Sequence, residues 1–246
     1  MAPGWLNIIA AVYVPLSVAT ALGVAADVSQ YRRQPMAVMN AVWPLTLLYW
    51  GPLGLIFYVW FGRAPVTKAG AMKTGAMKTS GAMTMEAMHG EGMAMTHRPD
   101  PPMWQATFNG AAHCGAGCAL GDFIGDWLAF ATAFAVFGSL FGGKLLAAFV
   151  LAYLFGIAFQ YFAVAPMRHL GLREGLIAAI KIDTLSLVAY EVGMFVWMGV
   201  RQWLLPDLEP TSIVYWFMMQ IAMVLGFATT YPVNWWLIRH GIKERM

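Results

Sequence analysis

The fold is decided by one stretch, His113-Cys114-Gly115-Ala116-Gly117-Cys118-Ala119-Leu120-Gly121-Asp122-Phe123-Ile124-Gly125-Asp126-Trp127, which holds both cysteines of the protein. Residues four apart share one face of an α-helix, and two series with this spacing run through the stretch. One series is polar and consists of Cys114, Cys118, Asp122 and Asp126. The other consists of Gly117, Gly121 and Gly125. Because a series of glycines lets a second helix backbone approach closely, we expect the adjacent polar series to face protein rather than lipid.

Composition places the chain among membrane proteins. It is 60% hydrophobic and 11% charged, with a mean hydropathy of +0.62, whereas soluble domains have roughly 25% charged residues. No cationic start is followed by a small-residue cleavage site, so we do not expect a cleaved signal peptide. The net charge of +3 is small, and the basic residues lie near segment ends. That pattern fits topology signals better than nucleic-acid binding.

Six hydrophobic segments are long enough to cross a bilayer, which takes about 20 residues each. We therefore expect an all-α, polytopic membrane helical bundle with about six transmembrane helices, at roughly residues 6–26, 37–61, 114–138, 145–165, 174–200 and 211–238. Pro44 and Pro52 predict kinks in the second helix. The chain divides into an N-terminal two-helix segment (1–61), a methionine-rich flexible loop (62–112) and a four-helix core (113–246).

Lys and Arg residues predict the orientation, because they are enriched in cytoplasmic connections. If both termini are cytoplasmic, 11 of the 15 basic residues are on the inner side, and the other four are Arg32, Arg33, Lys144 and Arg201. We therefore expect a bacterial inner-membrane protein with both termini and the methionine-rich loop in the cytoplasm. If the loop residues and Lys181 are left out, five basic residues remain on the inner side against four on the outer side. A different number of spans would therefore change the predicted orientation.

The loop contains a repeat. The sequence Gly70-Ala71-Met72-Lys73-Thr74 recurs immediately as residues 75–79, and eight of the 18 methionines lie between Met72 and Met103. Thioether sulfur is a soft, uncharged ligand, and soft ligands select Cu(I). The predicted metal-capturing residues are Met83, Met85, Met88, His89, Met93 and Met95. The alternatives are a low-complexity linker and a loop that packs on the membrane surface.

A second candidate metal site follows the loop. His113, Cys114 and Cys118 combine an imidazole with two thiols one helical turn apart, a set that can hold Cu(I) or Zn(II). A structural zinc site takes four ligands and only three are present, which favours Cu(I) or a ligand from elsewhere. A redox dithiol and two buried thiols that only pack are the alternatives.

Charged residues in the hydrophobic segments predict a buried site, because ionisable groups are costly inside a membrane. From their depth along the helices we expect one cluster, formed by Asp122, Asp126, Lys181 and Asp183. Its excess negative charge calls for a bound cation or a proton, and purely structural pairing is the alternative. Two turns beyond Asp183, Glu191 and Met194 predict a second, deeper metal-binding site. Asn234 is a candidate supporting donor.

Several motifs together resemble one known family. They are His-Cys-x2-Gly-Cys-x2-Gly-Asp (113–122), Lys-x-Asp-Thr-Leu-Ser-Leu (181–187) with Glu191-x-Gly-Met194, and Tyr-Pro-Val-Asn-x-Trp-Leu-Ile (231–238) followed by Gly241-x-Lys-Glu. This set is similar to a bacterial multi-pass membrane family catalogued as domain of unknown function 4396. Some of its members are labelled copper oxidases. The resemblance extends from about Trp104 to the C-terminus and points toward copper.

The expected function is binding, and transport, of a soft metal ion by an integral membrane protein in copper homeostasis. Cu(I) is the expected ion and Zn(II) the alternative. We expect a transporter or metal-binding protein rather than an enzyme. No nucleotide-binding motif of the type Gly-x4-Gly-Lys-Ser/Thr is present. The expected partners are the lipid bilayer, the metal ion and a copper chaperone or copper enzyme, not nucleic acid; an oligomer is left open. Two alternatives remain: a thiol/quinone redox enzyme that uses Cys114 and Cys118, and a copper chaperone or assembly factor for a membrane or periplasmic copper enzyme.

Overall fold

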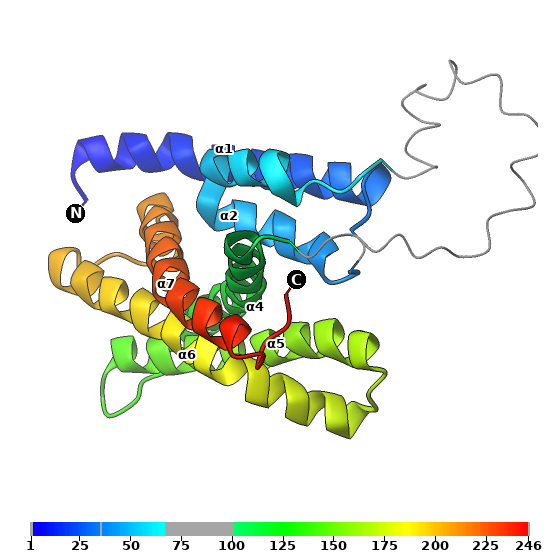
Figure 1. The fold of residues 1–246 in the computed structure, drawn as a ribbon. Helices are drawn as coiled ribbons and strands as arrows, with labels where there is room; N and C mark the ends of the chain where they lie inside the picture. Colours follow the sequence, from blue (N-terminus) through cyan, green and yellow to red (C-terminus); the bar gives the residue numbers. More distant parts are fainter. Residues whose placement is uncertain (1, 35, 67–100, 246) are drawn as a thin grey trace, which may run out of the picture.

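The computed structural model describes residues 2–34, 36–66 and 101–245, and these form an all-α protein (Figure 1). The helices in chain order are α1 (Gly4–Gln30), α2 (Met39–Phe57), the π-helical turn η1 (Tyr58–Gly62), α4 (Met103–Thr132), α5 (Leu140–Arg168), α6 (Leu172–Leu204) and α7 (Ile213–Arg239). Four segments are long and apolar enough to cross a membrane: α1, Met39–Gly62, α5 and α7. The helices α4 and α6 are 30 and 33 residues long but fall outside this apolar group.

Apolar side chains on the outside of the bundle indicate contact with lipid. On α1, for example, Ile8, Val12 and Leu22 are each more than 60% exposed. Large apolar side chains are costly to expose to water, but a bilayer solvates them. The chain is therefore a helical membrane protein, as its composition predicts.

The central helix is α4, which contacts α2, α5, α6 and α7. Its glycine series faces α5 at very short range. A Cβ atom added to Gly117 would lie 2.7 Å from the Cα of Gly156, and one added to Gly125 would lie 2.7 Å from the Cα of Ala148. A Cβ on Gly121 would collide with the backbone of Ala152. The two helices can pack this closely only because α4 has no side chains at these three positions.

The segment from α2 to η1 is a hairpin rather than a straight rod. At Gly51 the backbone leaves the helical conformation, with φ 54° and ψ −138°. Gln34 then contacts both ends of the segment: its backbone N–H donates to Oδ1 of Asn40, and its Nε2 donates to the carbonyl of Gly62, both at 2.9 Å. In a straight helix these two residues would be roughly 33 Å apart. The segment is therefore long and apolar enough to span a membrane, as predicted for residues 37–61, but it reverses at Gly51 and enters and leaves the bundle at the same end.

Polar side chains satisfy the carbonyl groups that the break at Gly51 leaves without helical partners. The hydroxyl of Tyr13 on α1 donates to the carbonyl of Trp50 at 2.9 Å, and Nε2 of Gln220 on α7 donates to the carbonyl of Leu48 at 2.6 Å. Broken helices are tolerated at membrane depth only where protein supplies such partners. The tip of the hairpin is thereby fixed inside the bundle.

The hairpin places the two termini at opposite ends of the bundle. Leu6 and Ala10 of α1 pack against Val214 at the start of α7, whereas the C-terminus follows the other end of α7 (Figure 1). We call this other end the C-terminal end. The expectation that both termini lie on one side of the membrane counted residues 37–61 as a crossing, whereas the structure has a hairpin there.

Candidate functional site

Buried polar side chains follow one face of α4 through the bundle. Each is at most 1% exposed. We call this set the polar column. Its members are His113, Cys114, Cys118, Asp122 and Asp126 of α4, Asp183 and Glu191 of α6, and Lys243 of the C-terminal tail. The spacing of four along α4 and the two-turn separation on α6 bring these side chains into the interior. They form three clusters, and Asp122, Asp126 and Asp183, which were predicted to share one cluster, each belong to a different one.

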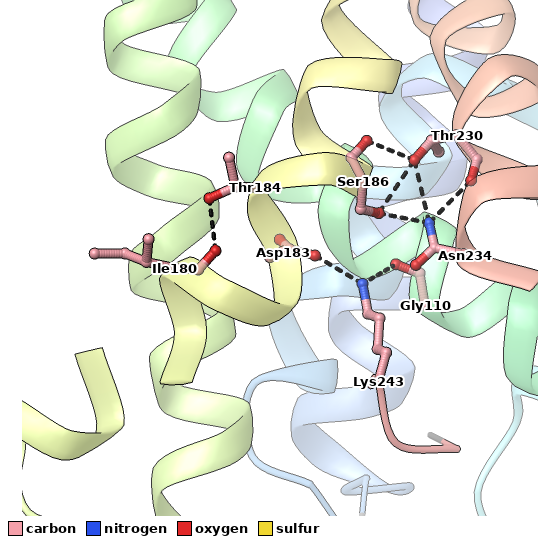
Figure 2. Close-up of polar contacts among 8 residues, drawn as sticks. All are labelled: Gly110, Ile180, Asp183, Thr184, Ser186, Thr230, Asn234 and Lys243. Atoms are coloured by element: carbon pink, nitrogen blue, oxygen red, sulfur yellow. Dashed lines mark hydrogen bonds and ion pairs between the residues drawn. The ribbon is translucent and has the colours of Figure 1, made fainter. Parts of the chain in front are cut away.

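The first cluster lies at the C-terminal end and is shown in Figure 2. Nζ of Lys243 donates to Oδ1 of Asp183 at 2.7 Å and to the carbonyl of Gly110 at 3.4 Å. Beside it, Nδ2 of Asn234 donates to Oγ of Ser186 at 2.7 Å. Asn234 thus lies beside Gly110 and bonds to its neighbours Ser186 and Thr230. Lys243 belongs to the Gly241-x-Lys-Glu motif, but it was not predicted to join this cluster.

Sequence analysis predicted Lys181 as the lysine of this cluster, but the structure has Lys243 there. Lys181 is exposed, whereas Asp183 is fully buried. Residues two apart on a helix do not face each other, so α6 cannot bury both side chains on one face. Matching depth along the axis was therefore not enough to identify the partner of Asp183.

His113 belongs with this first cluster and not with the cysteines. Its ring lies beside Phe159, with 6.1 Å between the ring centres, and it interacts electrostatically with Asp183 and Lys243. Its ring nitrogens approach the backbone of Phe159, but neither has normal hydrogen-bond geometry to a described residue. Because His113 and Cys114 are neighbours on a helix, their side chains point about 100° apart.

The second cluster is at the centre of the column. Cys114 and Cys118 are free thiols in mutual contact, Glu191 lies next to Cys118, and Asp122 interacts with Glu191. Within the described part of the chain, neither carboxyl group accepts a hydrogen bond of normal geometry. Buried carboxyl groups without partners are costly, and they call for a cation, protons or water.

Two tyrosines that sequence reasoning missed border the central cluster. They are Tyr49, near the tip of the α2 hairpin, and Tyr190 of α6, both fully buried. They meet at Gly115, where an added Cβ would lie 2.6 Å from Oη of Tyr49 and 2.9 Å from Cε2 of Tyr190. The adjacency of Tyr190 and Glu191 was the only signal in the sequence. The contribution of Tyr49 depends on the hairpin, which hydropathy does not reveal.

The third cluster surrounds Asp126, near the other end of the bundle. Asp126 accepts a short hydrogen bond from the hydroxyl of Tyr215. Two cations flank the ring of Tyr215: Nζ of Lys144 is 4.8 Å and Cζ of Arg201 is 5.0 Å from its centre. Lys144 and Arg201 also line a cavity of about 320 Å³ with Gln202 and Glu209. This end of the column therefore has its own positive charge.

The described part of the chain assembles no complete metal centre. Across residues 2–34, 36–66 and 101–245, no group of three or more His, Cys, Asp or Glu side chains is placed to hold a metal ion. Met194 is buried in the apolar core. The predicted ligands in the loop lie outside the described residues: Met83, Met85, Met88, His89, Met93 and Met95. What the described structure offers a soft ion is the cysteine pair of the central cluster.

Comparison with known proteins identifies a family but no activity. Residues 103–243 match the family described as Domain of unknown function (DUF4396). No curated protein and no solved structure shows a significant match to the chain. The matched segment contains every member of the polar column. Because the match covers more than half of the chain, this protein belongs to the DUF4396 family.

Proposed function

We propose that this protein binds a soft cation, Cu(I) by preference, at the central cluster and carries it through the membrane along the polar column. One observation carries the proposal: two contacting free thiols lie beside two buried carboxyl groups that accept no hydrogen bond of normal geometry from the described residues. Thiolates are soft ligands that select Cu(I). Buried charge within a membrane segment is, by default, an indication of function.

The small number of ligands favours Cu(I) over Zn(II). Zinc is almost always held by four tetrahedral ligands in structural sites, whereas Cu(I) accepts two thiolates in a nearly linear arrangement. The described part of the chain offers Cys114 and Cys118 without a third cysteine or histidine. Glu191 and Asp122 then supply negative charge on the path that leads away from the thiols.

The hairpin brings most of the described basic residues to one end of the bundle, which suggests how the protein is oriented in the membrane. Eight of the eleven described basic residues lie at the C-terminal end: Arg32, Arg33, Arg63, Arg168, Arg173, Arg239, Lys243 and Arg245. Lys144 and Arg201 lie toward the other end, and Lys181 lies part-way along α6. Basic residues mark the cytoplasmic side. We therefore place the C-terminus in the cytoplasm of the bacterial cell and the N-terminus outside. Gly62 and Trp104, described residues on either side of the methionine repeat, both lie at the C-terminal end. The role of the methionines in collecting the ion stays a prediction from the sequence.

A redox enzyme is the second candidate, because one further feature favours it. An apolar cavity of about 470 Å³ is lined by Ala119 and Leu120, which follow Cys118 on α4, together with Trp127 and Trp216. A lipid-soluble quinone would fit such surroundings. In that case Cys114 and Cys118 would close to a disulfide and give two electrons and two protons to the quinone.

Metal analysis separates the two candidates. Purified protein loaded with Cu(I) under reducing conditions is expected to hold one copper per chain. The variants Cys114→Ser and Cys118→Ser should lose it, while the matched control Ala119→Ser, one residue along α4, should retain it. A protein that stays free of copper while its two cysteines cycle between thiol and disulfide would refute metal binding and support the redox candidate.

Uptake measurements test transport separately from binding. Proteoliposomes with the wild-type protein should take up Cu(I) well above the rate of empty vesicles, and Glu191→Gln should reduce the rate because it removes a charge from the central cluster. If wild-type protein binds copper but transports it no faster than Glu191→Gln, the transport claim is wrong. The copper chaperone or assembly factor would then be the better interpretation.

A further inference from the structure

The C-terminal tail inserts a single side chain into the bundle. After α7 the chain turns at Gly241, which has φ +68°, and the backbone N–H groups of Ile242 and Lys243 donate to the carbonyl of Leu237 at 3.0 and 3.3 Å. Among the described residues after Arg239, only Lys243 is buried. The tail thus positions one ammonium group inside the protein and is otherwise exposed.

The ammonium group occupies a site built from oxygen atoms. It donates hydrogen bonds to Asp183 and to the carbonyl of Gly110. Two further oxygen atoms nearby, Oδ2 of Asp183 and Oδ1 of Asn234, have no hydrogen-bond partner in the described chain. Both side chains are fully buried, and Oδ1 of Asn234 lies 3.3 Å from the Cβ position of Gly110. One carboxylate, one amide oxygen and one backbone carbonyl converge here (Figure 2). Such hard oxygen ligands suit a hard cation and not Cu(I).

Outside this site the tail makes the backbone hydrogen bonds to Leu237 and one side-chain ion pair. Arg168 and Glu244 form an ion pair at 2.7 Å, but their side chains are 39% and 30% exposed. Ion pairs as exposed as this one contribute little to stability. By contrast, a buried carboxylate that loses its partner is strongly destabilising. Lys243 can therefore leave only when another cation takes its place beside Asp183.

We infer that Asp183, Asn234 and the carbonyl of Gly110 form a site for a monovalent alkali cation, and that Lys243 fills this site as a tethered ammonium that the free ion displaces. Occupation by the ion releases the tail and opens the cytoplasmic end of the polar column. This site is separate from the central cluster, so it does not depend on whether the protein binds copper.

Competition between the ion and Lys243 can be measured on the wild-type protein. The probe is Na⁺, compared with choline at equal ionic strength and pH, and the readout is the rate at which an amine-reactive ester labels Lys243, followed by mass spectrometry. Labelling should rise roughly tenfold when Na⁺ is at about ten times its dissociation constant, since the open population grows as 1 + [Na⁺]/Kd. The exposed Lys181 serves as the internal control and should label equally in both salts. Equal labelling of Lys243 in Na⁺ and choline would overturn the inference.

Variants test the same site from the other direction. In Lys243→Met the carboxylate of Asp183 has lost its ammonium, so Na⁺ should raise the melting temperature of the purified protein relative to choline. Lys181→Met, the matched loss of an exposed lysine, should show no salt-specific shift. The shift should also vanish in Asp183→Asn/Lys243→Met, which removes both charges. A shift of the same size in this double variant would place Na⁺ elsewhere and refute the site.

Discussion

The contact between α4 and α5 makes a strong prediction for Gly125. An alanine Cβ at this position would lie 2.7 Å from the Cα of Ala148, 2.9 Å from its nitrogen and 3.1 Å from the carbonyl carbon of Ala147. Carbon atoms that are not bonded prefer separations of about 3.5–4.0 Å. All three neighbours belong to the backbone, so no side chain can rotate away. The Gly125→Ala variant must therefore move α5 away from α4 by roughly 0.8 Å or more.

Two opposing terms set the size of the effect. Overpacking a well-packed interior costs about 1–3 kcal/mol, and a backbone contact belongs at the upper end. Alanine favours the helix over glycine by about 1 kcal/mol. The net loss is then about 2 kcal/mol, which corresponds to a fall of roughly 4–8 °C in melting temperature for a chain of this size. Gly199→Ala on α6 is the matched control, because a Cβ there meets nothing within 4 Å. It should leave the melting temperature unchanged or raise it.

The two cysteines provide the assay. Cys114 and Cys118 are the only cysteines of the chain and both are fully buried, so a fluorogenic thiol dye reports unfolding of the bundle during a thermal ramp. Gly125→Ala should unfold several degrees below both the wild type and Gly199→Ala. If Gly125→Ala melts within one degree of Gly199→Ala, about the error of such a ramp, the helices are not as closely packed as the structure shows and the reasoning fails.

Two further predictions concern the buried ion pair and the topology. Asp183→Asn leaves the buried ammonium of Lys243 without its counter-ion and should lower the free energy of unfolding by about 3–5 kcal/mol. The double variant Asp183→Asn/Lys243→Met should recover most of this stability in the same thermal assay. If the losses of the two single variants simply add, the two residues are not coupled. In a background of Cys114→Ser/Cys118→Ser, a membrane-impermeant thiol reagent applied to intact spheroplasts should label Ala2→Cys but not Arg245→Cys, because the hairpin places the termini on opposite sides. Labelling of both or of neither would mean that the termini share a side.

Local spacing revealed what lies along α4, because side-chain direction within one helix follows from the sequence itself. Residues four apart share a face whatever the rest of the chain does, and Cys114, Cys118, Asp122 and Asp126 are all buried in the structure. The all-α class and the family were confirmed as well. The class follows from composition and the lengths of apolar segments, and the family from residue motifs, so neither requires knowledge of tertiary contacts.

Contacts between distant segments could not be obtained in this way. Hydropathy depends on the number of apolar residues and does not register a single positive φ. It therefore did not reveal the reversal at Gly51, which puts the two termini at opposite ends of the bundle. The partner of Asp183 is 60 positions further along the chain, in a tail that reads as a basic, solvated end. Lys181 was chosen for its depth, but its position two residues from Asp183 turns it to the opposite face.

The distribution of charge along the polar column explains why a travelling cation would be held at its centre. At the C-terminal end Asp183 is paired with Lys243, and at the other end Asp126 has Tyr215 with Lys144 and Arg201 nearby. Within the described chain the central pair, Glu191 and Asp122, has no basic side chain among its interacting groups. Both ends are therefore neutralised by the protein's own cations, which repel an entering ion, whereas the centre gains charge balance only from an ion or from protons. Under the proposed function the ends act as gates and the thiols mark the site at which the ion is held.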